Sequence, residues 1–515
     1  KKRGAKMKKK IVVIGAGPGG LAAAMMLSAN GYDVSVYEKQ SYVGGRNGSF
    51  QLEDYTFDIG PTFLSMPHIA EEIFAESHRN LHDYMNLQEL EAMYELIFPD
   101  KKVTISRDPE KMKETIEKLF PGNGEGYTRF MEETEKKMDA LTPILQGKMD
   151  RYIHYLQGKV IKALPHLSLG KSLYDVLSDY FTDEQLKLSF TFQSKYLGMS
   201  PWECPGAFSI LSYMEHAYGI YHPIGGLNQL PKSMAKVIEE HGGKIHVNAG
   251  VKKLWLDGKK VKGVVLEDGS RISADEVVVN GDFAHVMTNL VDDGVLKKYS
   301  KQKLEKKKYS CSTFMIYVGL DKVYENMPHH TIVFADDYKK NVEEITKTKK
   351  LSADPSIYVQ NAVVTDSTLA PEGKSGLYIL APVPNNFSNI DWEQHKESFR
   401  KLVFETLEKK TGYKDIEKHI EVEKIITPKD WEQEIYVYKG ATFNLGHQLT
   451  QMMVLRPHNK FEELENCWLV GGGTHPGSGL PTILESARIT TKILREKYEN
   501  HKVTTHVPKE VGKAL

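Results

Sequence analysis

The chain has 515 residues, which is enough for two or three domains with large hydrophobic cores. Its 68 basic and 68 acidic residues cancel, and the basic excess of nucleic-acid-binding proteins is absent, so we expect no nucleic acid partner. Cys204, Cys311 and Cys467 lie far apart and form neither CxxC nor metal-ligand spacing. We therefore expect no metal site and no disulfide, and cysteines that are buried in a reducing compartment.

The sequence contains no run of 18 apolar residues, and its basic N-terminal residues lack the apolar segment of a signal peptide. We expect neither a transmembrane helix nor an export signal. The protein should be cytoplasmic or bound peripherally to a membrane. Because Met7 opens a basic run directly before the first predicted strand, we expect the natural chain to start there.

The stretch 11–38 predicts a strand, a glycine turn, a helix and a second strand. Gly15 permits the tight turn, Gly17 lets a pyrophosphate approach the backbone, and Gly20 lets the helix pack closely on the strand. The helix N-terminus then offers free N–H groups and a positive dipole end to phosphate. A glycine turn alone also serves structural ends, but the flanking elements favour dinucleotide binding.

Glu38 follows Gly20 at the spacing of the acid that binds a ribose hydroxyl in dinucleotide folds. A carboxylate at this position disfavours the 2′-phosphate of NADP. The motif does not by itself separate FAD from NAD.

Two further glycine turns follow the predicted strand–turn–helix–strand unit of residues 11–38. Residues 43–47 carry Gly45 and Arg46, and residues 58–62 carry Gly60 and Pro61. Each could be an ordinary turn. Together, directly behind a nucleotide fold, they favour a cofactor site, because arginine neutralises a pyrophosphate with a planar fork of donors.

Residues 66–215 are predicted to be mostly helical, with the charged run 132–137 on a solvated face. Within them, 148–172 places apolar residues at helical spacing among lysines and an arginine, a pattern typical of a helix in a membrane interface. A surface helix with a solvated basic face is an equally good interpretation. The apolar positions are Ile153, Leu156, Val160, Ile161 and Leu164, and the basic ones Lys148, Arg151, Lys159, Lys162 and Lys171.

The middle of the chain predicts a helix over 228–240, then a strand from 243 that enters a hairpin at the turn dipeptides 257–258 and 268–269. A strand over 276–280 closes this block. Between 305 and 455, β-branched and aromatic runs predict a sheet-based substrate domain, with strands at 312–320, 356–364 and 376–383.

Near the C-terminus, a strand over 467–470 leads into the glycine-rich turn 471–481 and a helix over 482–497. A strand, glycine turn and helix N-terminus thus recur far from the first set, as a large flavin cofactor requires. An NAD-binding fold would have a compact second βαβ unit directly after the first. Residues 66–215 do not have the pattern of such a unit. No second GxGxxG for a nicotinamide is visible, so this layout favours FAD.

Seven ordered motifs between about Lys10 and Glu496 resemble the bacterial-type phytoene desaturases, a flavoprotein family that includes C30 diapophytoene desaturases and diapocarotenoid oxygenases. Besides the first glycine turn with 43–46, they are Asp58–Pro61, Tyr221–Gly226, Val364–Gly373, Leu380–Pro384, Leu455–Asn459 and Gly473–Gly479.

The resemblance implies an α/β Rossmann-like FAD-binding fold of glutathione-reductase type, a mixed β-sheet substrate domain and a helical membrane-associating part. It implies FAD-binding segments at 7–75, 216–300 and 456–500, a helical and substrate part at 76–215, and a substrate domain at 301–455. The residues expected to contact FAD are Gly15, Gly17, Gly20, Glu38, Gly45, Arg46, Gly60, Pro61, Val251, Gly472, Gly473, Gly479, Leu480 and Pro481.

The proton acceptor of such a reaction is the open question. His475 and His222 lie in glycine turns expected to approach the flavin, and Asp58 is close to one in sequence. Each could instead be a hydrogen-bonded structural group, the commoner role of such residues. The stretch Lys148–Lys162 offers no clear match for the acid and base sometimes assigned in the family's helical region, so flavin with ordered water could suffice.

The expected activity is dehydrogenation of an acyclic polyisoprenoid, phytoene or 4,4′-diapophytoene, at a membrane surface, with oxygen or a quinone as electron acceptor. One alternative is an oxygenase of the same family that oxidises terminal methyl groups. Another is a flavin-fold membrane-binding protein that has lost its chemistry. The sequence leaves the oligomeric state open.

Overall fold

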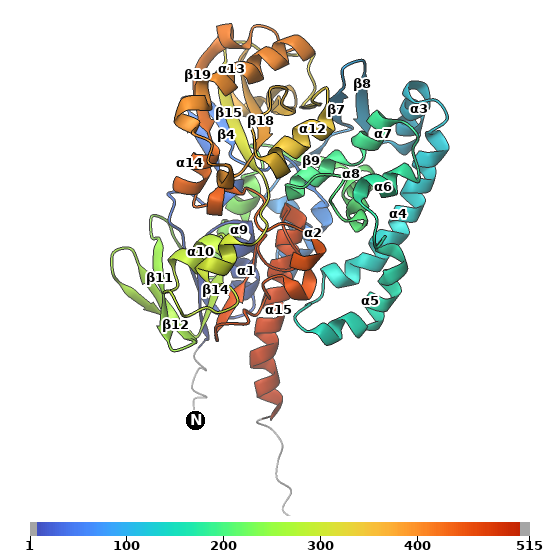
Figure 1. Ribbon diagram of the computed structural model, residues 1–515. Helices are drawn as coiled ribbons and strands as arrows, with labels where there is room; N and C mark the ends of the chain where they lie inside the picture. The colour runs from blue at the N-terminus through green and yellow to red at the C-terminus, as the bar shows by residue number, and fades with distance from the viewer. Residues whose placement is uncertain (1–7, 505–515) are drawn as a thin grey trace, which may run out of the picture.

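A sheet of five parallel strands forms one half of the molecule (Figure 1). The computed structural model describes residues 8–504, so the expected start at Met7 lies outside the described residues. The strand order is β10-β2-β1-β14-β20. The strands span Lys10–Ile14 (β1), Asp33–Tyr37 (β2), Lys244–His246 (β10), Glu276–Val279 (β14) and Cys467–Leu469 (β20).

Both faces of this sheet are buried, which explains the unbroken apolar runs of its strands. Ile11 and Val13 pack against a core of helices, whereas Val12 and Ile14 pack toward a three-stranded antiparallel meander. The helices are α1 (Pro18–Ala29), α9 (Gln229–Glu240) and α15 (Leu480–Thr504). The meander strands are β11 (Val251–Asp257), β12 (Lys260–Leu266) and β13 (Arg271–Ser273).

A seven-stranded mixed sheet forms the second half, in the order β19-β15-β18-β17-β16-β7-β8. Helix α13 (Trp392–Lys410) packs on one face, and the opposite face contributes to the cavity described below. The strands are Ala92–Ile97 (β7), Lys102–Ser106 (β8), Ser312–Leu320 (β15), His330–Val333 (β16), Ile357–Gln360 (β17), Ser375–Val383 (β18) and Ile420–Ile426 (β19).

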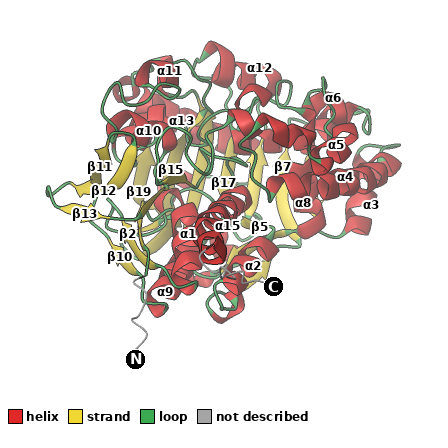
Figure 2. Cartoon of the chain, turned by 90° about the horizontal axis from the view of Figure 1, so that it is seen from below, coloured by secondary structure: helices red, strands yellow, loops and turns green. Residues whose placement is uncertain are grey.

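A group of helices clusters at one side of the molecule, beside the β7–β8 end of this sheet (Figure 2). They are α3 (Pro109–Leu119), α4 (Gly124–Leu145), α5 (Gly158–Ala163), α6 (Leu173–Ser178), α7 (Glu184–Ser189) and α8 (Ile210–Tyr218). Smaller strands connect the halves: β3 (Ser49–Leu52) with β4 (Tyr55–Asp58), and β5 (Leu64–Ser65), β9 (Ile220–Pro223) and β6 (Leu87–Glu89).

The remaining helices lie in the connections between these layers. They are α2 (Pro67–Glu76), α10 (Phe283–Asn289), α11 (Lys301–Glu305), α12 (Tyr338–Glu343) and α14 (Pro428–Gln433). All three cysteines are buried and unpaired, as expected. No helix of the described residues is long and apolar enough to cross a bilayer.

The prediction of a mostly helical 66–215 was wrong in part, because this stretch also supplies β7 and β8 of the large sheet. β7 pairs in parallel with β16, a strand more than 230 residues away, so tertiary pairing decides its conformation. The run 132–137 is not wholly solvated either. Lys137 is buried and donates hydrogen bonds to the Ser209 and Ser168 hydroxyls, and burial lowers its pKa to about 8.

Three other element predictions were inexact. The residues after 243 do not run into the hairpin: β10 joins the parallel sheet beside β2, and Asn248, in the left-handed region at φ 50°, separates it from β11. Helix α15 begins at Leu480, two residues before the predicted start. The strand at 356–364 is shorter than predicted, since β17 ends at Gln360.

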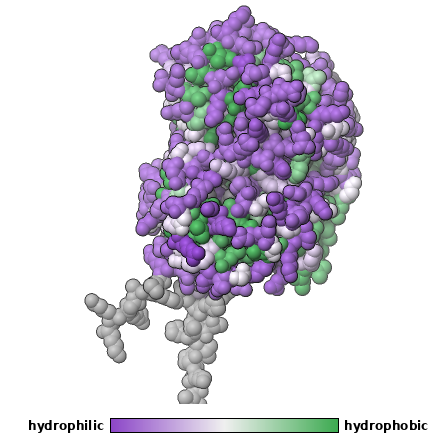
Figure 3. Space-filling model, turned by 60° about the vertical axis from the view of Figure 1, so that its left-hand side comes forward, coloured by the Kyte–Doolittle hydropathy of each residue, from purple (hydrophilic) through white to green (hydrophobic). Residues whose placement is uncertain are grey.

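The stretch 148–172 is not one amphipathic helix but three short helical segments: Tyr152–Leu156, α5 and Leu164–His166. Val160 is buried in the core, yet the other four predicted apolar residues are exposed, together with Tyr152 and Leu169. Leu156 is 72% and Tyr152 70% exposed. The face drawn in Figure 3, by contrast, is mainly hydrophilic with small apolar patches.

The buried guanidinium of Arg456 fixes the C-terminal glycine turn. Within residues 8–504 it forms no ion pair with a carboxylate, and it donates instead to backbone carbonyl groups of the C-terminal turn and of the 445–451 loop. These are the carbonyl oxygens of Leu445, Gly446, Gln451, Gly472 and Thr474, at 2.5–3.2 Å. Burial lowers the pKa of Arg456 to about 9, so the side chain is still charged at neutral pH.

Replacing this side chain should therefore destabilise the fold. Arg456→Met removes the donors of five carbonyl groups in a dry interior, and we expect a loss of about 3–5 kcal/mol in the free energy of unfolding. The urea midpoint of the purified protein measures this loss. Arg271, which is exposed over the ring of Trp255, is the control: Arg271→Met should cost less than about 1 kcal/mol. Equal effects of the two changes would contradict the role of Arg456.

Candidate functional site

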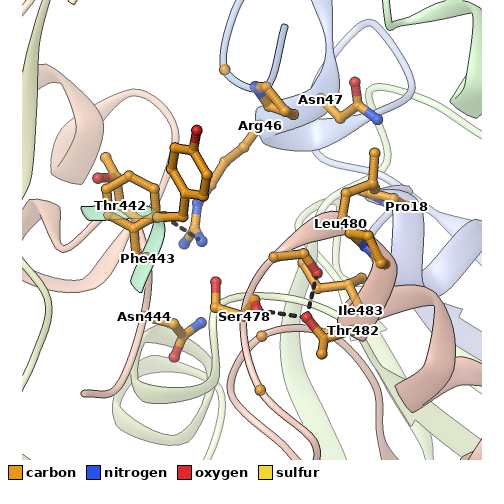
Figure 4. A pocket seen from close by; sticks show the side chains of 18 of the residues that line it. Pro18, Arg46, Asn47, Thr442, Phe443, Asn444, Ser478, Leu480, Thr482 and Ile483 are labelled. Carbon is orange, nitrogen blue, oxygen red and sulfur yellow. Dashed lines mark hydrogen bonds between the residues drawn. The ribbon is translucent and has the colours of Figure 1, made fainter. Parts of the chain in front are cut away.

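A cavity of about 830 Å³ connects the two halves. One end lies at the carboxyl ends of β1, β14 and β20, which is where open parallel sheets bind ligands. The other end extends between the floor of the seven-stranded sheet and the helical region. Figure 4 shows side chains from the first turn region, the 442–444 loop and the C-terminal turn converging on it.

The first glycine turn forms part of this cavity wall. Gly15 and Gly17 line it, together with Pro18 at the start of α1. A Cβ atom at Gly17 would come within 2.8 Å of the Asn280 side-chain nitrogen, so the turn has no room for a larger residue. Gly20 does not line the cavity; a Cβ there would lie 2.3 Å from the Gly15 carbonyl oxygen. Its role is the close packing of helix on strand.

Glu38 and Val251 both line the cavity, at the tips of β2 and β11. The Glu38 carboxylate accepts hydrogen bonds from the backbone N–H groups of Ala16 (2.7 Å) and Gln40 (2.8 Å). These bonds fix the carboxylate beside the first turn. Burial raises the pKa of Glu38, and the backbone hydrogen bonds oppose that shift.

Arg46 lines the cavity opposite the C-terminal turn (Figure 4). Its guanidinium forms an ion pair with Asp282 at 2.6 Å and donates to the Thr442 carbonyl oxygen at 3.2 Å. The neighbouring Gly45 lies against the first turn, where a Cβ atom would be 3.4 Å from the Gly17 Cα. Gly60 and Pro61 also line the cavity, and the Tyr378 hydroxyl donates to the Gly60 carbonyl oxygen at 2.6 Å.

Several buried polar atoms in this wall have no hydrogen-bond partner among residues 8–504. The side-chain amide of Asn47 makes no hydrogen bond through either its oxygen or its nitrogen, and the Thr442 hydroxyl makes none. Buried polar groups are normally satisfied, so these atoms indicate a polar ligand. With the helix N-terminus and a cationic side chain beside them, the donor set fits the phosphates and ribityl hydroxyls of a flavin dinucleotide.

The C-terminal turn supplies the opposite wall. Gly472, Gly479, Leu480 and Pro481 line the cavity as a group, with Gly479 in the left-handed region at φ 102°. Gly473 faces away, because a Cβ atom there would lie 2.6 Å from the Phe283 side chain. His447 Nε2 accepts the Ser478 N–H at 2.9 Å, which fixes the loop beside the cavity.

The three residues predicted as proton acceptors do not line the cavity. His475 is buried, and its Nε2 is hydrogen-bonded to the carbonyl oxygens of Ile144 and Gly147. Burial lowers its pKa to about 4. His475 therefore ties the C-terminal turn to the end of α4.

His222 and Asp58 are also engaged in the packing behind the wall. His222 Nε2 lies 2.7 Å from the Asp366 carboxylate, and both side chains are fully buried. Asp58 accepts the N–H groups of Leu227 and Asn228, and burial raises its pKa to about 6. These contacts give all three nominated residues structural partners.

The rest of the cavity is largely apolar and aromatic. Its wall there is formed by the large sheet and by α4, α8 and the 192–197 segment. The residues are Met138, Leu145, Phe192, Tyr196, Leu197, Phe208, Ile210, Leu211, Met214, Met315, Ile332, Ile357, Tyr358 and Leu380.

Sequence reasoning missed four polar residues in this apolar part: Lys195, Glu215, His330 and Tyr358. None belongs to a motif, and they come together only because distant elements meet. Glu215 accepts the Tyr94 hydroxyl at 2.6 Å, and burial raises its pKa to about 7. Burial lowers the pKa of Lys195 to about 7, and its ammonium group lies 4.7 Å from the centre of the Tyr338 ring.

Known proteins resemble the chain over nearly its whole length. The family model of flavin containing amine oxidoreductases matches residues 18–492. A 4,4′-diapophytoene desaturase (4,4′-diapolycopene-forming) of Methylomonas sp. is 50% identical over 490 residues, covering 95% of this chain and 96% of the relative. A zeta-carotene-forming phytoene desaturase of Myxococcus xanthus is 35% identical, with 94% of each chain covered.

The fold agrees with solved structures. An oxidoreductase from Methanosarcina mazei superposes with a TM-score of 0.63, at 18% identity, over 95% of this chain and 100% of the other. The predicted Rossmann-like sheet with a mixed substrate sheet is therefore confirmed, as is the predicted family. The chain belongs to the flavin containing amine oxidoreductase family, and within it to the carotenoid and diapophytoene desaturases.

Proposed function

We propose that the protein is an FAD-dependent desaturase that removes hydrogen from an acyclic C30 polyisoprenoid, 4,4′-diapophytoene, in carotenoid biosynthesis. The observation that carries this proposal is the 50% identity, over nearly the full length of both chains, to a 4,4′-diapolycopene-forming diapophytoene desaturase. A phytoene desaturase of Myxococcus xanthus is 35% identical and a diapophytoene desaturase of Staphylococcus aureus 33%, so the choice of a C30 substrate rests on the Methylomonas relative.

The polar end of the cavity supports FAD as the cofactor. The turn at Gly15 and Gly17 with the α1 N-terminus would hold the pyrophosphate, and Glu38 a ribose hydroxyl. The rest of the FAD molecule would lie between Arg46, Asn47 and the C-terminal turn. When bound, the flavin supplies a two-electron acceptor for hydride.

The apolar part of the cavity supports the substrate class. An acyclic polyisoprenoid hydrocarbon has no polar group to recognise, so shape and the exclusion of water must hold it in line. Aromatic and branched side chains form most of this wall. Oxygen or a quinone is the expected final electron acceptor, since no second dinucleotide motif is present in the sequence.

The exposed apolar residues of 152–169 support peripheral attachment to a membrane. Six large apolar side chains between Tyr152 and Leu169 are each at least 46% exposed, and lysines flank them. This arrangement is typical of a segment in the membrane interface. Leu145 and Gln146, shortly before the segment, line the cavity, so a substrate dissolved in the bilayer would have a short path to the site.

Blocking the first turn should abolish cofactor binding. In Gly17→Val the new side chain meets Asn280 and fills the space needed by a pyrophosphate, so we expect protein without yellow colour. The ratio of flavin to protein absorbance after purification with added FAD measures this. Gly158→Val is the control, since nothing lies within 4 Å of a Cβ atom there. Unchanged flavin content in Gly17→Val would show that the site is elsewhere.

The substrate is tested by pigment analysis. Cells that make 4,4′-diapophytoene should gain visible absorbance from a coloured C30 polyene when they express the protein, because each desaturation lengthens the conjugated chain. Cells that make phytoene should gain less colour. Colour that changes only when a finished polyene is supplied would instead show an oxygenase, and Gly17→Val should leave both strains colourless.

Membrane attachment should depend on the exposed apolar side chains. We expect the double change Ile153→Asp and Leu156→Asp to weaken binding to anionic liposomes at least about tenfold, because each buried side chain contributes roughly 1.5–3 kcal/mol. Co-sedimentation measures the effect. Val364→Asp, at an exposed apolar residue outside this segment, should leave binding unchanged. Binding that survives the double change would exclude this segment as the anchor.

A further inference from the structure

One imidazole of the cavity wall has a free nitrogen in a dry environment. His330 begins β16, is only 1% exposed, and lines the cavity. Its Nδ1 lies 2.6 Å from the Tyr358 hydroxyl, which in turn lies 2.7 Å from the Thr62 hydroxyl. Its Nε2 is buried and has no hydrogen-bond partner in the described part of the chain.

His330 sits where the apolar part of the cavity meets the cofactor end. Thr62 directly follows Gly60 and Pro61, which line the cofactor end. The Phe63 ring lies 5.5 Å from the His330 ring, and the Tyr378 hydroxyl holds the Gly60 carbonyl. The hydrogen-bonded row Thr62–Tyr358–His330 therefore fixes the imidazole relative to the segment beside the cofactor.

The hydrogen-bonded row also selects a tautomer. When the Tyr358 hydroxyl donates to Thr62 Oγ1, His330 Nδ1–H donates to the tyrosine oxygen and Nε2 keeps its lone pair. Burial raises the pKa of Tyr358, so its proton stays in place. Burial also lowers the pKa of His330 to about 3, and the nearby His222 adds to this shift, so the imidazole is neutral at physiological pH.

The titratable groups behind His330 keep it in this state. The ring of His329 lies 4.4 Å away, and burial lowers its pKa well below the usual range. His222, 4.8 Å from His329, is paired with Asp366. The ring of Tyr358 stacks at 5.7 Å. His329 and Tyr358 carry no charge at neutral pH, so neither stabilises a positive charge on His330.

We propose that His330 Nε2 accepts the proton that the polyisoprenoid loses in each desaturation, an inference that rests on the proposed function. A bound flavin would accept one hydrogen of the substrate as hydride, with the electron pair of its C–H bond. The adjacent C–H bond breaks, its proton moves to Nε2, and its electron pair becomes the new C=C bond. The imidazolium returns its proton to water after the product leaves.

A weakly basic imidazole is adequate for this step. A carbon next to the site of hydride loss becomes strongly acidic as positive charge develops, so the acceptor needs position more than basicity. A neutral acceptor is also compatible with an apolar substrate, because a permanent charge in the wall would have to be desolvated each time the polyene enters. Tyr358 and Thr62 are positioning residues in this scheme.

The test compares His330→Gln with His329→Gln in the FAD-loaded enzyme. Both histidines are buried neighbours, but His329 does not line the cavity and is bonded to the Thr365 hydroxyl at 2.8 Å. Anaerobic mixing with 4,4′-diapophytoene gives the rate at which flavin absorbance bleaches. Equilibrium titration with the coloured product gives the affinity for the polyene and shows whether the cavity is intact.

We expect His330→Gln to slow bleaching about 100-fold or more, the usual contribution of a positioned base, while product affinity stays within about threefold. His329→Gln should bleach at nearly the wild-type rate. Imidazole added to His330→Ala should restore part of the rate, and Tyr358→Phe should lower kcat with KM unchanged.

The two proposals fail differently. If wild-type enzyme does not bleach with the C30 substrate, the proposed function is wrong. If wild-type enzyme bleaches and His330→Gln is equally fast, or loses product affinity in parallel with rate, His330 is not the proton acceptor. Equal slowing in His329→Gln would likewise overturn the assignment.

Discussion

The meeting of three strand ends is the constraint on which the rest of the molecule depends. β1, β14 and β20 lie side by side in one parallel sheet, and each ends in a turn at the same edge. A Cβ atom at Gly19 would lie 2.7 Å from the Asn280 side chain and 3.1 Å from the Gly471 nitrogen. Only glycine allows this approach, so the first helix and the last turn can share one site. The chain leaves this sheet after β2 and again after β14, and each time it returns to it.

The second sheet is attached to this edge through tyrosine hydroxyls. Tyr317 and Tyr378 donate to the carbonyl oxygens of Ile59 and Gly60, at 2.5 and 2.6 Å, and Tyr358 bonds Thr62. Residues 59–62 are therefore held by hydrogen bonds to three strands of the large sheet. These bonds are dry, because the phenol rings pack among apolar side chains, and a dry hydrogen bond is costly to leave unmade. The segment's position beside the cavity is thus fixed by the substrate half, and the two halves form one site.

Sequence reasoning succeeded where local pattern and burial agree. β15 was predicted to the residue, because Ser312–Leu320 is buried along its whole length and reads as a continuous run of strand formers. β7 was missed because Ala, Met, Glu and Leu in its sequence favour helix, and its conformation comes from pairing with distant β16. The glycine turns of the site could be found, since each needs a special backbone. His330 and Glu215 could not be found from the sequence. They line the cavity only because distant segments pack together, and no local pattern marks such residues.

The contacts of His475 contrast with those of His330. His475 lies in a glycine turn beside the cavity, but its Nε2 is hydrogen-bonded to the carbonyl oxygens of Ile144 and Gly147 at the end of α4. His330 lies on β16, whose backbone is already paired with β17 and β7. Its side chain is therefore not needed to satisfy backbone carbonyl groups. Rigid sheet positions therefore combine fixed geometry with an available nitrogen, and a reaction that needs position more than basicity favours them over turns.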